Sequence, residues 1–321
     1  MTSAALDAPP DLTAPGSPAP SGPPPARRRP RARRWMSYLT FIALAGPNVA
    51  LLVVFVYKPL VQSFQYSTLQ WNIGSPTARS VGLGNYVDWF QDPRTPEILT
   101  TTAIFTVTTV GGSLVLGLLL ALLLNQRLAG RGIARTVAFA PYVLSGIAVG
   151  MLWLFIFDPR YGLMSTVLAW IGLNSPDWYN DGPWALAMVI IVYLWKNIGY
   201  VALIYLAGLQ AVPQDLRDAA ALDGASSRRT LVSIVLPLLG PTTFFLSVTT
   251  LLSSLQSFDI IHAMTKGGPL GSTTTLMYQI YQESFVSGRA GYASAVATIL
   301  FGILLVITLV QLKFVERKVH Y

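Results

Sequence analysis

The sequence contains no cysteine, only two histidines and few charged residues. Without cysteine the chain forms no disulfide bond and offers no thiolate to a metal or a substrate. The histidines, His262 and His320, are far apart in the chain, and neither belongs to an H-E-x-x-H segment. A G-x-x-x-x-G-K-[ST] loop is also absent, which excludes ATP binding by that route. Because catalysis needs positioned acids, bases or nucleophiles, the sequence favours a protein that is not an enzyme and holds no metal.

The scarcity of charge accompanies long apolar runs. Hydrophobic residues make up 53% of the chain and charged residues 11%, against roughly 25% charged in an ordinary soluble domain. A helix that crosses a bilayer needs about 20 consecutive apolar residues. Stretches that qualify lie at roughly 37–57, 99–124, 135–157, 184–209, 238–262 and 291–312. The alternating pattern of a membrane β-barrel is absent. The sequence therefore predicts an all-α membrane protein with six transmembrane helices.

The net charge of +8 comes mainly from lysines and arginines in four places. They precede the first predicted span, separate the second from the third and the fourth from the fifth, and follow the sixth. Cytoplasmic loops carry an excess of Lys and Arg. We therefore expect both termini and the loop at 213–237 to face the cytosol, and we attribute the positive charge to topology and not to nucleic-acid binding.

The first 35 residues differ from the rest in composition. Proline, alanine, serine and arginine dominate them, so they cannot bury a core and are predicted to be a disordered basic tail. Residues 36–321 form the predicted membrane domain, with its core at 97–312. The run FVYKPLVQSF at the end of the first span has no small-x-small cleavage site, which favours an uncleaved helix over a signal peptide.

The loop at 213–237 has a strong local pattern. Pro213 suits the first turn of a helix, and residues 214–223 are good helix formers. Gly224 is suited to the left-handed residue that ends such a helix. Ser226 or Ser227 can cap a second helix, which runs on towards the fifth span. The pattern predicts a helix, a glycine turn and a second helix.

The same loop carries a long spaced pattern, E-A-A-x3-G-x9-I-x-L-P, with aspartate in place of the first glutamate. The matching residues are Asp218, Ala219, Ala220, Gly224, Ile234, Leu236 and Pro237. This loop resembles that of bacterial binding-protein-dependent ABC transporter permeases. In that family the loop docks into a cleft on a cytosolic ATPase, so the resemblance implies that these residues form the coupling interface. The alternative is an amphipathic helix that rests on the lipid headgroups.

Other segments are similar to the carbohydrate uptake branch of that family. They are VGLGNYVDWF, PYVLSGIAVGMLWLFIFDPRYGLM, TKGGPLGSTTTLMYQIYQESF and the C-terminal VQLKFVERKVHY. The resemblance covers roughly residues 36–321 and is strongest to the first permease subunit of importers for glycerol-3-phosphate or for di- and oligosaccharides. It implies the architecture of a type I ABC importer in a bacterial cytoplasmic membrane.

The resemblance also implies partners. They are a second permease subunit in a heterodimer, a cytosolic ATPase dimer, an extracytoplasmic solute-binding protein and the lipid bilayer. ATP would bind to the partner subunits, so no cofactor is expected in this chain. The competing hypothesis is a self-sufficient secondary transporter or channel, which would need its own coupling-ion site.

Polar residues inside the predicted spans are candidates for a substrate pathway, because buried charge in a membrane is costly. Lys196 and Asn197 lie in the fourth span, and Gln256 and Asp259 lie towards the end of the fifth. The alternative is that Lys196 and Asp259 pair or reach the interface, and that Gln256 bonds to a neighbouring helix.

Overall fold

The computed structural model describes residues 31–126 and 129–316. Most of the predicted tail at 1–35 lies outside these residues, although a helix already begins at Arg31 within it. The chain divides into two units, residues 1–57 and 58–321, which are described separately.

The described part of the first unit is helical throughout. The α-helix α1 (Arg31–Leu52) continues into a short π-helix, η1 (Val53–Tyr57). Large apolar side chains are exposed along this segment, including Leu44 at 78% and Phe55 at 71%. Helices with exposed apolar side chains are suited to contact with lipid. The apolar helical run that could cross a membrane here is Tyr38–Ser67, which extends the first predicted span.

The second unit begins with four short elements. Helix α2 (Lys58–Ser67) is followed by an antiparallel hairpin of β1 (Leu69–Gln70) and β2 (Arg79–Ser80), then by helix α3 (Gly84–Gln91). Leu69 pairs with Ser80 across the hairpin. The Asn85 side chain donates to the carbonyls of Ser67 and Leu69, at 2.8 and 3.0 Å, and so attaches α3 to the end of α2.

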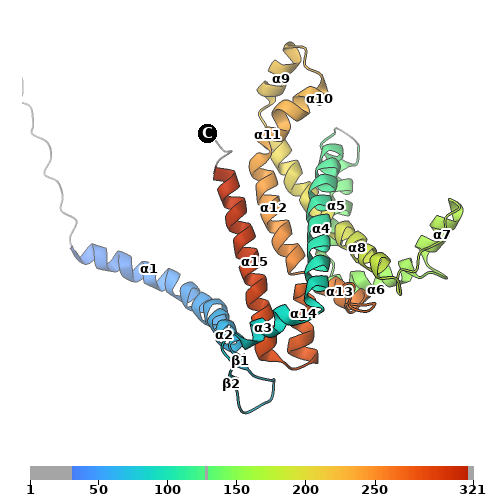
Figure 1. Cartoon of the computed structure of the whole chain (residues 1–321). Coiled ribbons are helices and arrows are strands. Elements are labelled where there is room, and N and C mark those ends of the chain that lie inside the picture. The colour runs from blue at the N-terminus through green and yellow to red at the C-terminus, as the bar shows by residue number, and fades with distance from the viewer. Residues whose placement is uncertain (1–30, 127–128, 317–321) are drawn as a thin grey trace, which may run out of the picture. The chain divides into compact units, whose positions relative to one another are not determined.

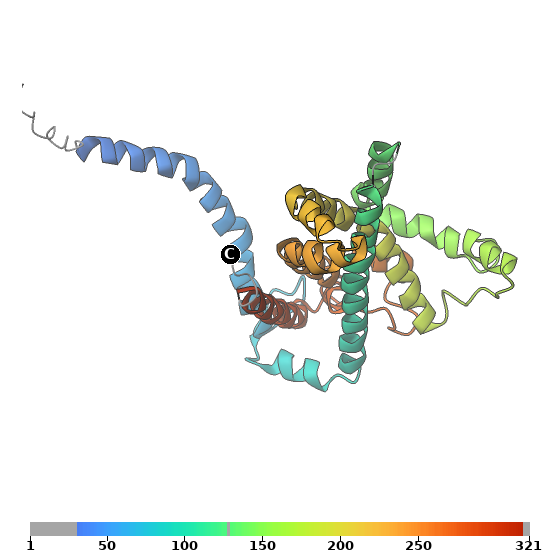
Figure 2. The same cartoon turned by 90° about the horizontal axis from the view of Figure 1, so that it is seen from above.

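The centre of the second unit is a set of long helices. Helices α4 (Thr95–Leu124), α8 (Gly182–Ala211) and α12 (Gly240–Leu255) contact one another, and α15 (Ala290–Glu316) packs on α12 (Figures 1 and 2). Phe105 and Tyr193 meet edge to face between α4 and α8, with ring centroids 5.3 Å apart. Both side chains are buried, so this contact belongs to the apolar core.

The third predicted span, 135–157, is not a single helix. It consists of α5 (Arg131–Val143) and α6 (Gly146–Phe157), which are bent by 101° at Leu144 and Ser145. Leu144 is extended, with ψ of 147°, and Ser145 has ψ of 130°, so neither residue is helical and the helix cannot continue through them. Among the described residues, five helices are long and apolar enough to cross a membrane, or six if this bent pair counts as one. The predicted span at 135–157 is therefore a pair of bent helices.

The remaining elements lie at the two ends of the long helices. After α6 comes α7 (Leu163–Trp170), which lies away from α12 and α15 in both views (Figures 1 and 2). The loop at 213–237 lies at one end of the second unit, and α3, α13 and α14 lie at the other (Figure 1). The elements after α8 are α9 (Gln214–Leu222), α10 (Ser227–Thr230), η2 (Leu231–Val235), α11 (Leu236–Leu238), α12, α13 (Asp259–Met264), α14 (Leu276–Tyr281), η3 (Gln282–Val286) and α15.

Candidate functional site

The loop between α8 and α12 has the predicted helix–glycine–helix structure. Helix α9 follows Pro213 and ends at Leu222, two residues before Gly224, whose φ is +74°. The amide of Gly224 donates to the carbonyl of Ala221, and that of Ala225 donates to the carbonyl of Ala220, a Schellman motif. The Ser226 hydroxyl then accepts from the amide of Arg229 and caps α10. These local hydrogen bonds account for the turn between the two helices.

The predicted coupling residues divide between an exposed and an internal face. Asp218, Ala219 and Gly224 are exposed, whereas Ala220 is 6% exposed. The Gln214 side chain donates to Asp218 Oδ1 at 3.0 Å. Further along, Ile234 and Leu236 are half-buried and Pro237 is exposed. Ala220 is therefore a packing residue, and the exposed face is the one available to a partner.

One side chain joins this loop to a long helix. Arg217 of α9 donates through Nη2 to the carbonyl of Leu209, near the end of α8, at 2.9 Å. Leu209 is buried in the apolar cluster formed by α4 and α8. Since the last carbonyls of a helix lack partners within it, the guanidinium satisfies one of them. Displacement of α9 would therefore act directly on the end of α8.

The four predicted pathway residues line one cavity. Lys196 and Asn197 come from the middle of α8, and Gln256 and Asp259 come from the break between α12 and α13. The cavity has a volume of about 530 Å³. Its other lining residues are Tyr142, Tyr193, Ser253, Ser257, Phe258 and Ile260. Aromatic rings, hydroxyls and amides together suit a ligand with many hydroxyl groups.

Some polar atoms in this cavity form hydrogen bonds within the described part of the protein and others do not. The Asn197 amide donates to the carbonyl of Tyr193 at 2.8 Å, which fixes its orientation. The Ser257 hydroxyl is buried and has no partner among the described residues. A buried hydroxyl without a partner is costly, so a ligand that donates or accepts there would gain free energy.

Lys196 and Asp259 reach the cavity from different helices, α8 and α13. Among the described residues the ion pairs within 4.0 Å are Arg94–Asp92 and Arg289–Glu283, so Lys196 and Asp259 form no such pair. Lys196 Nζ donates instead to the carbonyl of Tyr142 at 3.2 Å. Asp259 Oδ1 accepts from the amide of Ile260 at 2.9 Å.

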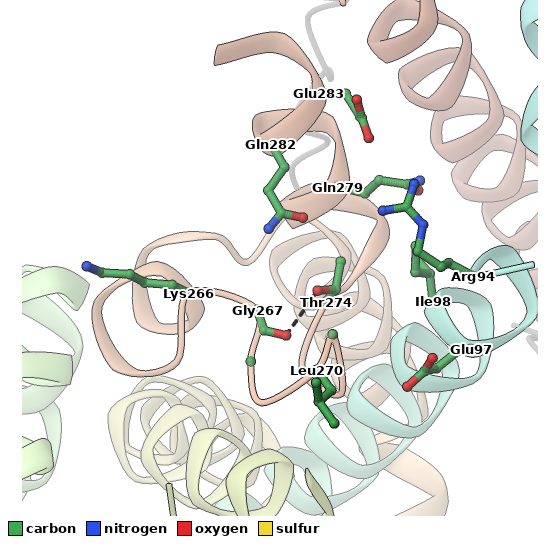
Figure 3. Close-up of a pocket in the computed structure, with 12 residues that line it drawn as sticks. Arg94, Glu97, Ile98, Lys266, Gly267, Leu270, Thr274, Gln279, Gln282 and Glu283 are labelled. Atoms are coloured by element: carbon green, nitrogen blue, oxygen red, sulfur yellow. Dashed lines mark hydrogen bonds between the residues drawn. The ribbon is translucent and has the colours of Figure 1, made fainter. Parts of the chain in front are cut away.

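A second polar cavity, of about 310 Å³, lies where the start of α4 meets α14, η3 and the loop before α14 (Figure 3). Two of the four charged residues that line it, Arg94 and Glu283, form ion pairs, whereas Glu97 and Lys266 form none among the described residues. Arg94 pairs with Asp92, and its hydrogen bonds hold the pKa of Asp92 below the usual value. Glu283 pairs with Arg289, and Gln279 accepts from the indole of Trp89 at 3.1 Å. These contacts hold the loops around the cavity together.

Sequence reasoning missed the aromatic lining of the larger cavity. Tyr142 is present there because the chain bends directly after it, and Tyr193 because it lies one turn before Asn197. Pro141 and the Ser145–Gly146 pair were the available signal for the bend, since proline, serine and glycine punctuate helices. No local signal identifies Tyr193 or Phe258 as lining residues.

The fold and the cavity together define a class of protein. Long apolar helices, a bent pair of apolar helices and a polar cavity describe a multi-pass helical membrane protein. The chain belongs to the family of binding-protein-dependent transport system inner membrane components, whose sequence pattern matches residues 113–321.

Similar proteins agree with this family over most of the chain. The sn-glycerol-3-phosphate transport system permease protein UgpA of Agrobacterium fabrum (strain C58 / ATCC 33970) is 39% identical over 279 residues, or 87% of this chain and 95% of that protein. UgpA of Brucella abortus biovar 1 (strain 9-941) is 38% identical over 279 residues, which again cover 87% of this chain and 95% of that protein. A chain of a bacterial ABC transporter involved in the import of the acidic polysaccharide alginate superposes with a TM-score of 0.76, at 24% identity, over 89% of this chain and 96% of that one. The last likeness shows a shared fold.

Proposed function

We propose that this chain is a permease subunit of an ATP-driven ABC importer that carries a carbohydrate or a glycerol phosphoester across the cytoplasmic membrane of a bacterium. The observation that carries the proposal is the exposed face of the loop at 213–237, which holds Asp218, Ala219 and Gly224 in the spaced pattern of the family. Membership of the family and the names of its relatives support the same function.

The substrate class rests on the cavity and on those relatives. The cavity has a cation at Lys196, amides at Asn197 and Gln256, and an unpartnered hydroxyl at Ser257. Such groups bind hydroxyls and can contact one anionic group. The relatives are named for sn-glycerol-3-phosphate and for alginate, which are both polyhydroxylated and anionic.

The chain would act without catalysing a reaction itself. It would pair with a second permease subunit, bind a cytosolic ATPase dimer through the loop at 213–237, and receive substrate from an extracytoplasmic solute-binding protein. ATP would be bound by the ATPase, so the chain needs no cofactor. The clustering of Lys and Arg supports an orientation with both termini and this loop in the cytosol.

The transport cycle would use two states of the spans. Closure of the ATPase dimer would move α9, and Arg217 would pass that movement to the end of α8 through the carbonyl of Leu209. Since Lys196 and Asn197 lie on the same helix, the movement would change access to the cavity. The ATPase thus shifts an equilibrium between inward and outward access.

The test is ATP-driven uptake by the reconstituted importer. Proteoliposomes that hold the full complex are loaded with ATP, and uptake of labelled sn-glycerol-3-phosphate and of maltose is compared. Gly224→Asp places a charged side chain on a residue with φ of +74° and is expected to abolish uptake and co-purification of the ATPase. Gly172→Asp is the matched control, because Gly172 has φ of +77° and equally open surroundings outside the loop.

Two results would contradict the proposal. One is a chain that purifies from native membranes without an ATPase. The other is uptake that survives in Gly224→Asp, or that runs on an ion gradient in the absence of ATP, which would support a secondary transporter.

A further inference from the structure

The break between α5 and α6 leaves backbone groups without partners inside an apolar segment. The last carbonyls of α5 and the first amides of α6 have no partners within their helices. Ser145 is the N-cap of α6, but its side chain accepts no hydrogen bond from the helix. Such groups are costly within a bilayer and need partners from elsewhere in the protein.

The C-terminal end of α5 is matched by a cation from α8. Lys196 Nζ donates to the carbonyl of Tyr142, in the last turn of α5, at 3.2 Å. The ammonium also lies 5.4 Å from the centre of the Tyr142 ring. A cation is favourable at a helix C-terminus, where the carbonyls carry partial negative charge.

The N-terminal end of α6 is matched by an anion from the start of α13. The carboxylate of Asp259 lies against Gly146, the first residue of α6, so closely that a Cβ on Gly146 would overlap Asp259 Oδ2. The other oxygen, Oδ1, is held by the amide of Ile260. A carboxylate is favourable at a helix N-terminus, where unpaired amides carry partial positive charge.

The contact between α6 and α13 continues one turn further along. A Cβ on Gly150 would approach the Ala263 side chain to 2.7 Å and the Ile260 carbonyl to 3.6 Å. Gly146 and Gly150 therefore form a bare strip that lets α13 approach α6 closely. This strip keeps Asp259 at the beginning of α6.

We propose that Lys196 and Asp259 form a charge clamp that holds the bend in the third span, the cation at the end of α5 and the carboxylate at the start of α6. Each charge complements a helix end and not the other charge. Both are positioning residues, because the bend places Tyr142 in the wall of the cavity. The inference goes beyond the proposed function, since it depends on no substrate.

The bend can be measured directly by electron spin resonance. The chain has no cysteine, so Ile133→Cys in α5 and Phe155→Cys in α6, which are 73% and 78% exposed, are its two labelling sites, and this subunit is labelled before it is assembled with its partners. In the full-length protein within its complex, in lipid nanodiscs, the distance distribution between the labels is expected to be narrow. Asp259→Asn and Lys196→Met should each broaden it and add a second distance, whereas Lys196→Arg should preserve it.

Steric displacement provides a second route to the same contact. Gly146→Ala changes no charge but pushes the carboxylate away from α6, and it should broaden the same distribution. Gly302→Ala in α15, where a Cβ meets nothing within 4 Å, should leave it narrow. Asp88→Asn and Arg160→Met are controls that remove an exposed charge elsewhere. A distribution that stays narrow in Asp259→Asn, Lys196→Met and Gly146→Ala would overturn the proposal.

Exchanging the two charges distinguishes the clamp from a long-range ion pair between Lys196 and Asp259. Lys196→Glu combined with Asp259→Lys keeps opposite charges but places each at the wrong helix end. If the clamp exists, the distance distribution of the double variant should be at least as broad as that of the more strongly affected single variant. Recovery of the wild-type distribution would contradict the clamp. Because this measurement needs neither ATP nor substrate, it can succeed even if ATP-driven uptake is not found, and it can fail while uptake is intact.

Discussion

Gly199 of α8 lies directly against the main-chain carbonyl of Ala138 in α5. A Cβ on Gly199 would overlap that carbonyl and would lie 3.1 Å from the amide nitrogen of Phe139. Glycine is therefore required for the two helices to approach this closely, and no flexible side chain could move aside. The contact is three residues from Lys196, so it joins the same two helices, α5 and α8, as the hydrogen bond from Lys196 to Tyr142.

Gly199→Ala should destabilise the protein by about 1–3 kcal/mol, because an added methyl group forces α5 and α8 apart. The measurement is thermal unfolding of the purified complex in detergent. Gly111→Ala in α4 is the control, since a Cβ there meets nothing within 4 Å. It should be neutral or should stabilise by about 0.5–1 kcal/mol. Equal melting temperatures for wild type and Gly199→Ala would contradict the close contact.

The ion pair of Glu283 and Arg289 gives a second prediction. Arg289 Nη2 lies 2.6 Å from Glu283 Oε2, and the Glu283 side chain is 6% exposed while that of Arg289 is 46% exposed. Arg289→Met leaves a buried carboxylate without its partner and should cost about 1–3 kcal/mol, a value reduced by the solvent that reaches the arginine. Thermal unfolding measures it. Adding Glu283→Gln to Arg289→Met should recover part of the loss, and a further loss would contradict the burial of the charge.

Ala219 and Ala220, the two alanines of the spaced pattern in the loop at 213–237, should respond differently to replacement by leucine. Ala220 is 6% exposed, so Ala220→Leu overfills the loop interior and should destabilise the protein by about 1–3 kcal/mol. Ala219 is exposed, so Ala219→Leu should leave the melting temperature unchanged while it reduces co-purification of the ATPase. Normal ATPase binding by Ala219→Leu would place the docking face elsewhere.

Acid should weaken the contact of Asp92 with Arg94. Hydrogen bonds from Arg94 lower the pKa of Asp92 from its ordinary value of 3.8. The stabilisation is therefore complete above about pH 5 and is lost as the pH falls through the lowered pKa. Arg94 is 64% exposed, which limits the stabilisation to about 1 kcal/mol.

The measurement is the difference in melting temperature between wild type and Asp92→Asn. It should be constant from about pH 8 to pH 5 and shrink below pH 4. A difference that grows as the pH falls would have the wrong sign for a carboxylate with a lowered pKa.

The predicted loop and the predicted third span show where sequence reasoning works. The turn at Gly224 and a serine cap depend on a few neighbouring residues; the turn was confirmed, and of the two candidates Ser226 and Ser227 it is Ser226 that caps. The stretch 135–157 is apolar almost throughout, so its composition resembles that of one continuous helix. The bend there is supported by Lys196 and Asp259, which come from other parts of the chain.

The sequence by itself determined the apolar helices, the helix–glycine–helix loop and the family, because hydropathy, capping and motif spacing act over short stretches of chain. Only the tertiary structure decided that Lys196, Asn197, Gln256 and Asp259 line one cavity and that the third span bends beside them. The physical reason is that a charge can complement a helix end, and glycine can admit a neighbouring backbone, only when the packing has brought the two segments together.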